Sequence, residues 1–238
     1  MADILLLHGS CHGAWCWRDT IPALAALGHT ARAIDMPSHG TDPTPIAEVT
    51  LESCTRSVVD ALDKDTVVVA HSWGGFPATL AADIAPDRIR HLIYLCAYIP
   101  RDGLSLVDMR KLAPRQPILK AINRAEDGQS YTVFPEHAEE VFYADCPPGT
   151  VAYAQAHITP QATLPQTTPA RLGSGHTTIP RSYIRCAFDN AIPTEFQEEM
   201  ATALPATNRH LLSTSHSPFF ANPTGLATLI NDILNTPS

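Results

Sequence analysis

Three polar residues, each at the end of an apolar run, are of the types that nucleophilic catalysis requires. Ser72 follows the β-branched run at 66–70, Asp189 follows the segment SYIRCAF, and His216 follows the segment RHLLSTS. A serine hydroxyl becomes a good nucleophile only beside a base, and that base needs an acid to orient it. Because the carboxyl ends of parallel strands are where open sheets bind ligands, we expect these three residues to form a catalytic triad.

The residues around Ser72 are typical of a sharp strand-to-helix turn. Such a turn strains the backbone of its central residue and needs small residues two positions to either side. Here these are Ala70 and Gly74, where the usual pattern has a glycine in place of Ala70, and Gly75 allows close packing of the helix. The helix dipole would favour negative charge developing beside Ser72. The alternative interpretation is an ordinary turn in which Ser72 only caps the helix.

An oxyanion formed at Ser72 would need two backbone amides as donors. We expect one at Trp73, directly after the nucleophile, and one at Ser10 in the loop HGSCHGAWCW. His71 adjoins Ser72, but we expect it to be structural rather than the base, because neighbouring residues on a strand point to opposite faces. Asp35 also follows an apolar run but precedes Ser72. No HExxH or similar spacing occurs, so we expect no metal and no cofactor.

The elements that must position these residues alternate along the chain. Before residue 100, apolar runs predict strands at 4–7, 30–34, 66–70 and 91–97, with helices at 21–27, 51–62 and 74–85. After residue 178, strands at 183–188 and 209–213 alternate with helices at 193–204 and 223–234. This order favours an α/β fold with a mostly parallel, doubly wound sheet.

The alternation stops between residues 101 and 178. Short helices separated by proline-rich turns are expected there, at 104–119, 136–145 and 149–157. We therefore interpret 1–100 and 179–238 as one core, with 101–178 as a helical cap inserted after the fourth predicted strand.

Composition narrows the classes of partner. The net charge is −8 and no run of Lys or Arg occurs, which argues against nucleic acid or an anionic membrane as partner. The N-terminal MADILLLHGS lacks a basic segment, and no apolar stretch is long enough to span a membrane. We expect a cytoplasmic protein with six reduced cysteines. The expected partner is a small-molecule ester, and the sequence leaves a homodimer open.

Four stretches of this chain resemble the α/β-hydrolase superfamily, and more narrowly the branch of plant methylesterases, the salicylate-binding esterase and the S-selective hydroxynitrile lyases. They are HGSCHGAWCW, GHTARAIDMPSHGTDP, AHSWGG with LIYLCAYIP, and CAFDNAIPTEFQ. The chain looks like a bacterial-type esterase relative of that branch. The resemblance implies the α/β-hydrolase fold, a triad of Ser72, Asp189 and His216, oxyanion amides at Ser10 and Trp73, and a cap over the acyl and alcohol pockets.

The expected activity is hydrolysis of carboxylic esters through an acyl-enzyme. Amide, lactone or thioester hydrolysis, a hydroxynitrile-type carbon–carbon lyase and a non-catalytic small-molecule receptor stay open as alternatives. The lyases that the chain resembles carry Thr and Lys where this chain has Gly9 and Ser217, and we expect Gly9 to leave room beside the oxyanion hole. An acidic residue often precedes the catalytic His in this branch, whereas here Ser215 does. The residues predicted to line the substrate pocket are Gly9, Cys11, Phe134, Phe142, Tyr143, Tyr153 and Ser217.

Overall fold

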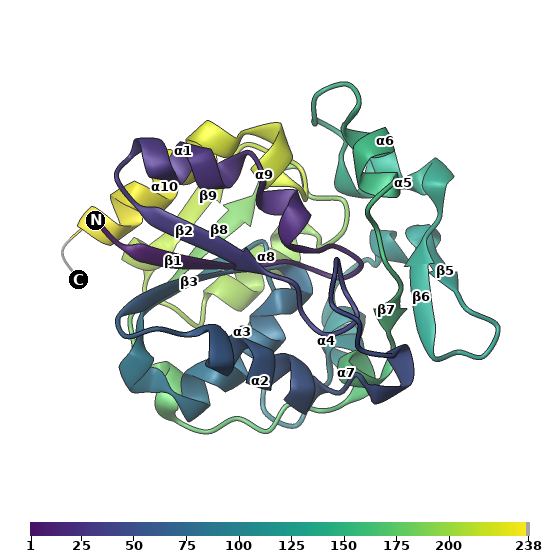
Figure 1. Cartoon of the computed structure of the whole chain (residues 1–238), viewed down its shortest axis with the longest axis horizontal. Coiled ribbons are helices and arrows are strands. Elements are labelled where there is room, and N and C mark those ends of the chain that lie inside the picture. Colours follow the sequence, from purple (N-terminus) through teal and green to yellow (C-terminus); the bar gives the residue numbers. More distant parts are fainter. Residues whose placement is uncertain (237–238) are drawn as a thin grey trace.

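The structure, a computed structural model, describes residues 1–236 and contains a six-stranded sheet in the order β2-β1-β3-β4-β8-β9 (Figure 1). Each neighbouring pair in it runs parallel. This sheet confirms the α/β-hydrolase fold that the sequence predicts. Residues 237 and 238, which end the predicted core segment 179–238, lie outside the described residues. The strands are β1 Asp3–Leu7, β2 Thr30–Ile34, β3 Thr66–His71, β4 Ile89–Leu95, β8 Arg181–Cys186 and β9 Arg209–Leu212.

Helices cover both faces of the sheet (Figure 1). In β1, Ile4 and Leu6 pack in one apolar cluster with α1 and α10, whereas Leu5 and Leu7 pack in another with α2 and α3. Successive side chains of a strand point to opposite faces, so a strand buried on both sides has a continuous apolar sequence. The core helices are α1 Thr20–Ala26, α2 Leu51–Ala61, α3 Gly75–Ile84, α8 Thr194–Ala201, α9 Pro218–Ala221 and α10 Pro223–Asn235.

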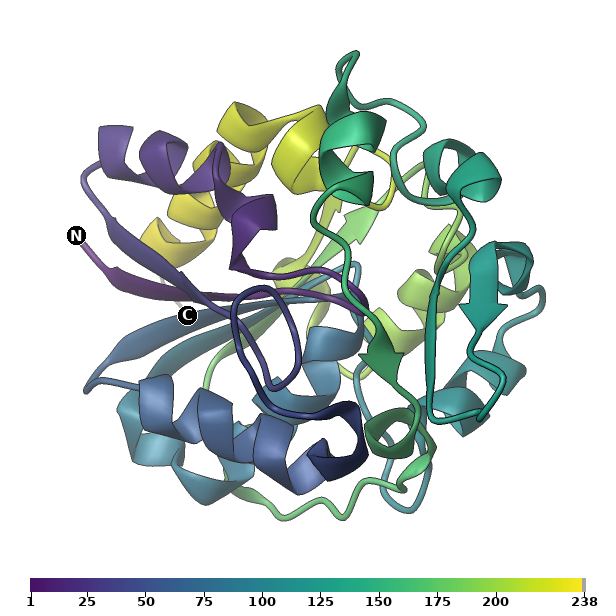
Figure 2. The ribbon, with the colours of Figure 1, turned by 45° about the vertical axis from the view of Figure 1, so that its right-hand side comes forward.

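Residues 101–178, called here the cap segment, lie mostly beyond the carboxyl ends of the core strands, and the last of them run back along α3 toward the start of β8 (Figure 2). The segment has short helices at α4 Leu106–Leu112, α5 Pro135–Phe142, α6 Thr150–Gln155 and α7 Leu164–Thr167. It also has a three-stranded antiparallel sheet, β5 Ile122–Arg124, β6 Ser130–Val133 and β7 Gln161–Ala162, which the prediction of a helical cap missed. The helix expected at 104–119 ends early because Pro114 disfavours helical backbone at the residue before it. The division into core and cap stays a prediction.

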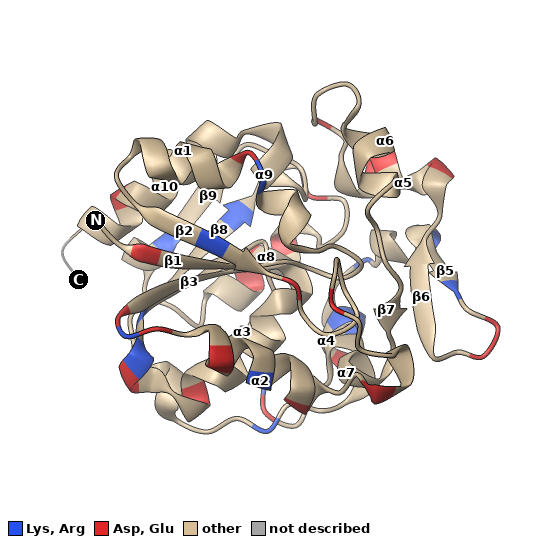
Figure 3. Ribbon diagram, viewed as in Figure 1, with Lys and Arg blue, Asp and Glu red and all other residues tan. Residues whose placement is uncertain are grey.

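Charged residues are dispersed over the ribbon, and acidic and basic positions are interspersed (Figure 3). The net charge of −8 comes from 24 acidic and 16 basic residues. The expectation that the chain has no polyanionic partner stays a prediction. Within residues 1–236, none of the helices has both the length and the apolar character that crossing a membrane requires.

Candidate active site

Ser72 lies at the turn between β3 and α3. Its backbone φ is +55°, in the left-handed region that a serine rarely adopts, and residues Ser72–Gly74 form a short 3-10 turn before the helix. The strained backbone that the sequence predicts is therefore present. A β-carbon at Gly74 would lie 2.8 Å from the His8 carbonyl oxygen, and one at Gly75 would lie 2.1 Å from the Tyr98 carbonyl oxygen. The turn requires both glycines because the helix begins against neighbouring backbone.

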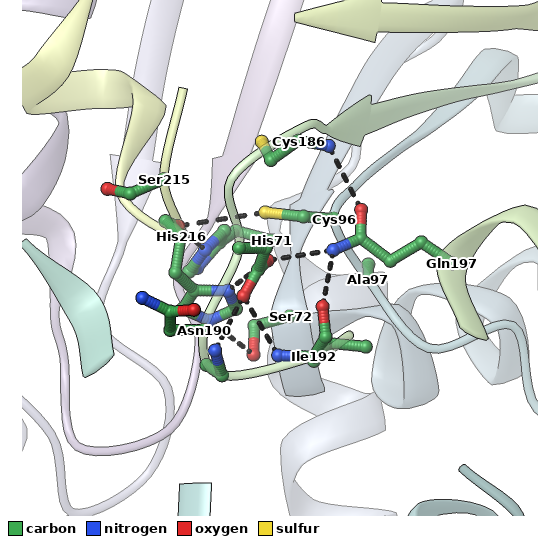
Figure 4. Close-up of polar contacts among 12 residues, drawn as sticks. His71, Ser72, Cys96, Ala97, Cys186, Asn190, Ile192, Gln197, Ser215 and His216 are labelled. Carbon is green, nitrogen blue, oxygen red and sulfur yellow. Dashed lines mark hydrogen bonds and ion pairs between the residues drawn. The ribbon is translucent and has the colours of Figure 1, made fainter. Parts of the chain in front are cut away.

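The structure brings together the three residues predicted as a triad. The Ser72 hydroxyl lies 3.1 Å from Nε2 of His216, and Nδ1 of His216 lies 2.7 Å from Oδ2 of Asp189. Ser72 is 7% exposed, and Asp189 and His216 are each 2% exposed. Ser72 comes from the end of β3, Asp189 from the loop after β8, and His216 from the loop after β9. Figure 4 shows Ser72 and His216 facing each other.

The Asp189 carboxylate accepts four hydrogen bonds. Its Oδ1 accepts the backbone N–H groups of Ala191 and Ile192, at 2.7 and 2.8 Å. Its Oδ2 accepts a hydrogen bond from Nε2 of Gln197 at 2.8 Å, in addition to the bond from Nδ1 of His216. An ionised carboxylate has the lone pairs for four such donors. Sequence reasoning missed Gln197, although it ends the motif DNAIPTEFQ that carries the family resemblance.

His71 supports the backbone of His216, the predicted triad base. Its Nε2–H donates to the His216 carbonyl oxygen at 2.8 Å, and the two rings lie 4.6 Å apart between centroids. Burial lowers the pKa of His71 well below its usual value, and the nearby His216 ring lowers it further. The His71 ring is therefore kept neutral. The expectation that His71 is structural agrees with this arrangement. The Cys96 thiol lies 3.6 Å from the same carbonyl oxygen.

The predicted oxyanion amides, at Ser10 and Trp73, have no hydrogen-bond acceptor within residues 1–236. Both are therefore available to a ligand, and their role as oxyanion donors stays a prediction. The Gly9 carbonyl, in the same peptide unit as the Ser10 N–H, accepts Nδ1–H of His8 at 2.8 Å. The Ser10 hydroxyl accepts a hydrogen bond at 2.7 Å from Nε2 of Gln166, a residue of the cap segment. The loop is thus held at Gly9 by its own residue His8 and at Ser10 by the cap segment.

A small cavity lies beside the Ser72 hydroxyl. Its volume is about 20 Å³, which is room for about one water molecule. Two of the predicted pocket residues, Cys11 and Phe142, line this cavity. The other lining residues are Ser10, His12, His71, Ser72, Ile118, Ile122, Tyr131 and His216.

Three predicted pocket residues, Phe134, Tyr143 and Tyr153, lie outside the cavity lining. The Tyr143 hydroxyl is buried and donates to Nε2 of His12 at 2.7 Å. Tyr143 therefore holds the lining residue His12 in place without itself lining the cavity. The Arg18 guanidinium covers the Tyr153 ring at 3.7 Å from its centroid. Phe134 directly precedes α5. The lining residues Ile122 and Tyr131 were missed because they lie in β5 and β6, which are too short to show a periodic pattern.

Gly9 and Ser217 also lie outside the lining, and the expectation that Gly9 leaves room is wrong. A β-carbon on Gly9 would lie 2.8 Å from both the Ser72 β-carbon and Nδ1 of His71. Glycine is needed because the loop is packed against Ser72 and His71. Ser217 is fully buried, and its hydroxyl has no hydrogen-bond partner among the described residues.

Among residues 1–236, one cluster of side chains has metal-ligating atoms close together. The ligand atoms of His71, Cys96 and His216 lie within 4.8 Å of one another. Nε2 of His71 and both ring nitrogens of His216 are already engaged in the hydrogen bonds described above. A metal ion taking these ligands would break the triad.

Comparisons with known proteins find this fold in several hydrolases. The profile described as "Alpha/beta hydrolase family" matches residues 4–229. Methylesterase 4 of Arabidopsis thaliana is 30% identical, over 96% of this chain and 95% of its own. The pyrethroid hydrolase of Sphingobium wenxiniae is 28% identical, over 100% of this chain and 89% of its own. A crystal structure of a pyrethroid hydrolase from Sphingobium faniae matches with a TM-score of 0.86 at 28% identity, over 99% of this chain and 98% of that one.

Proposed function

The chain belongs to the alpha/beta hydrolase family, and from that premise we propose that it hydrolyses carboxylic esters through an acyl-enzyme on Ser72. The predicted resemblance to plant methylesterases is confirmed by the matched relatives. Other relatives are named for pyrethroid hydrolysis. Carboxylic ester hydrolysis is the activity that we carry over to this chain.

One observation supports this proposal most strongly: the hydrogen bonds from Ser72 to His216 and from His216 to Asp189 form one chain. In the proposed reaction, Nε2 of His216 takes the proton of Ser72 as its oxygen attacks the ester carbonyl. The amides of Ser10 and Trp73 stabilise the resulting oxyanion. The protonated His216 then gives its proton to the departing alcohol, which leaves the acyl group on Ser72.

The second half of the reaction uses the same groups. His216 takes a proton from a water molecule, and the resulting hydroxide attacks the acyl carbonyl. When the second tetrahedral intermediate collapses, the proton returns to the Ser72 oxygen and the carboxylic acid leaves. Asp189 holds the His216 tautomer that presents Nε2 as an acceptor, and it stabilises the imidazolium that forms in each half.

The cavity walls favour an ester that is uncharged near the reacting carbonyl. Ile118, Ile122 and Phe142 supply apolar surface there, and Tyr131 contributes a ring. No Lys, Arg, Asp or Glu side chain lines this cavity among residues 1–236. A charged substituent at this place would lose its hydration without gaining an ionic partner.

The proposal also covers the role of the cap segment and the cellular compartment in which the protein acts. We propose that residues 101–178 form a cap that roofs the acyl and alcohol pockets, because Ile118, Ile122, Tyr131 and Phe142 all come from it. We propose the cytoplasm as compartment, because all six cysteines are free thiols. A homodimer stays open.

A carbon–carbon lyase of the hydroxynitrile type is the second candidate, since it would use the same triad. Gly9 and Ser217 argue against it. A threonine side chain has no space at Gly9, and Ser217 brings no positive charge to stabilise a departing anion. A non-catalytic receptor is disfavoured because a receptor has no need of the intact hydrogen-bond chain at Ser72.

A parallel assay separates these functions. Purified protein is offered a set of aryl and methyl esters and, separately, mandelonitrile. We expect ester turnover, negligible cyanide release, and a loss of roughly 10⁴-fold or more in ester turnover for Ser72→Ala. Cyanide release without ester turnover would favour the lyase, and no turnover of any compound would favour the receptor.

A further inference from the structure

The side chain of Gln197 lies in the protein interior on the inner face of α8. It is 0% exposed, and α8 also buries Phe196 and Met200. A primary amide without hydrogen-bond partners is costly to bury, so a glutamine at such a place needs partners for its donors and its acceptor.

All parts of the Gln197 amide have partners. Its Oε1 accepts the backbone N–H of Cys186 at 3.0 Å, and its Nε2 donates to the Ile192 carbonyl at 2.7 Å and to Oδ2 of Asp189 at 2.8 Å (Figure 4). The orientation of the amide follows from chemistry. A backbone N–H can only donate, whereas a carbonyl and a carboxylate oxygen can only accept.

These bonds restrain the Asp189 carboxylate from two sides. The N–H groups of Ala191 and Ile192 hold Oδ1, while Gln197 and His216 share Oδ2. Without the Gln197 donor, Oδ2 would keep His216 as its one protein donor, and the carboxylate would be held less firmly, by the two N–H groups on Oδ1 and by His216. The bonds to Cys186 and Ile192 also tie the end of β8 to the loop that carries Asp189.

We propose that Gln197 is a positioning residue of the triad, which aims Oδ2 of Asp189 at Nδ1 of His216. The inference rests on the proposed function, because its purpose is to orient the base that activates Ser72. Gln197 itself contacts neither the substrate nor the reacting atoms.

Gln197→Glu gives the sharpest test because it nearly preserves the shape of the side chain and keeps an acceptor for the Cys186 N–H. When protonated, the introduced carboxyl group can still donate to Asp189, whereas its ionised form repels that carboxylate. The neighbouring negative charge makes the new acid ionise at a higher pH than usual. We expect the ratio of variant to wild-type kcat/KM to fall as the pH rises. A purely structural role would lower this ratio equally at every pH.

Two further variants complete the design. Gln197→Met removes all three hydrogen bonds at similar length, and we expect a loss of about 10²-fold in kcat with little change in KM, independent of pH. Gln155→Glu adds the same charge at an exposed position on α6, where the amide bonds to the Pro135 carbonyl, and its activity ratio should stay near one throughout. Should Gln197→Met fail to fold, Gln197→Glu still carries the test.

A proton NMR measurement on the resting enzyme supplies a readout that does not depend on turnover. The Nδ1–H of His216, bonded to Asp189, should give a downfield resonance that moves upfield in Gln197→Met and shifts with pH in Gln197→Glu. A pH-independent ratio and an unmoved resonance would overturn the role of Gln197 while leaving the proposed function intact. A wild-type protein without Ser72-dependent ester turnover would instead overturn the proposed function.

Discussion

Asp189 and Asp35 are two carboxylates that follow strands and accept several hydrogen bonds. Of the two, Asp189 is the one that is hydrogen-bonded to a histidine. Asp35 accepts the N–H of Ala14 at 2.7 Å and both the N–H and the hydroxyl of Thr41, at 3.0 and 3.1 Å. Those contacts join loops of the core. Asp189 instead bonds to His216. The two residues therefore form a matched pair for separating a catalytic from a structural carboxylate.

We predict that Asp189→Asn lowers kcat/KM for an ester by up to about 10⁴-fold, because an amide donor facing Nδ1 selects the wrong His216 tautomer. Asp35→Asn should be much milder in its effect on turnover and act mainly on stability. Steady-state kinetics and thermal melting of both variants check this. The assignment of the acid is wrong if the two variants rank in the opposite order for turnover.

Single residues were predictable where their role follows from place in the chain. Ser72, Asp189 and His216 were predicted because each comes after a strand of the sheet, Ser72 directly and the other two in the following loop, and parallel strands bring their carboxyl ends to one edge. Gln197 was not found, because a glutamine in a helix gives no local sign of what it will face. The space at Gly9 was misjudged for the same reason: its neighbours, His71 and Ser72, come from a different strand.

Among the elements, the loop before His216 and the turn after α5 are directly joined. The Asp145 carboxylate, from the cap segment, accepts both the backbone N–H of Ser215, at 2.8 Å, and its hydroxyl. Ser215 stands where the resembled family often has an acidic residue. The carboxylate beside the triad base is here supplied by the cap segment instead.

We predict that Asp145→Ala lowers kcat by between about 10- and 100-fold, since it releases the loop that aligns His216. Glu140→Ala is the matched control, because the Glu140 carboxylate bonds to Lys120 inside the cap segment. A double-mutant cycle of Asp145→Ala with Ser215→Ala measures the coupling, which we expect at about 0.5–3 kcal/mol. Strictly additive effects would show that the contact has no part in positioning the loop.

The core elements were predictable and the cap sheet was not. The inner strands β1, β3 and β4 are almost entirely buried, so their sequences are nearly continuous apolar runs that stand out from the intervening helices. The strands β5, β6 and β7 have three, four and two residues, too few for any alternation to appear. Their pairing depends on contacts between residues far apart in the sequence, such as Tyr131 with Gln161.

For the whole molecule, buried neutral histidines make stability depend on pH. Burial, with a smaller effect of Arg90, lowers the pKa of His91 from 6.5 to about 4, and burial likewise lowers the pKa of His12 to about 4. Between these values the unfolded chain binds protons that the folded chain does not. Acidification therefore favours unfolding, by about 1.4 kcal/mol per pH unit for each such group.

We predict that the free energy of unfolding falls steadily as the pH is lowered from 6.5 toward 4. His91→Gln should make this fall shallower, because it removes one of these titrating groups. The His91 ring bonds to the Ser182 hydroxyl and lies at the end of the sheet opposite to the triad, so turnover should be little affected. Urea unfolding of both proteins at several pH values provides the measurement. Equal slopes for the two proteins would remove His91 as a contributor.

The central claim for the whole molecule is a covalent acyl group on Ser72 during turnover, and rapid-quench mass spectrometry of the intact protein tests it most directly. A p-nitrophenyl ester has a good leaving group, so deacylation should become the slower step and the intermediate should accumulate. We predict an added mass equal to the acyl group, located on the peptide that contains Ser72 and absent from Ser72→Ala. Steady ester turnover without any adduct, retained by a folded Ser72→Ala protein, would contradict the account.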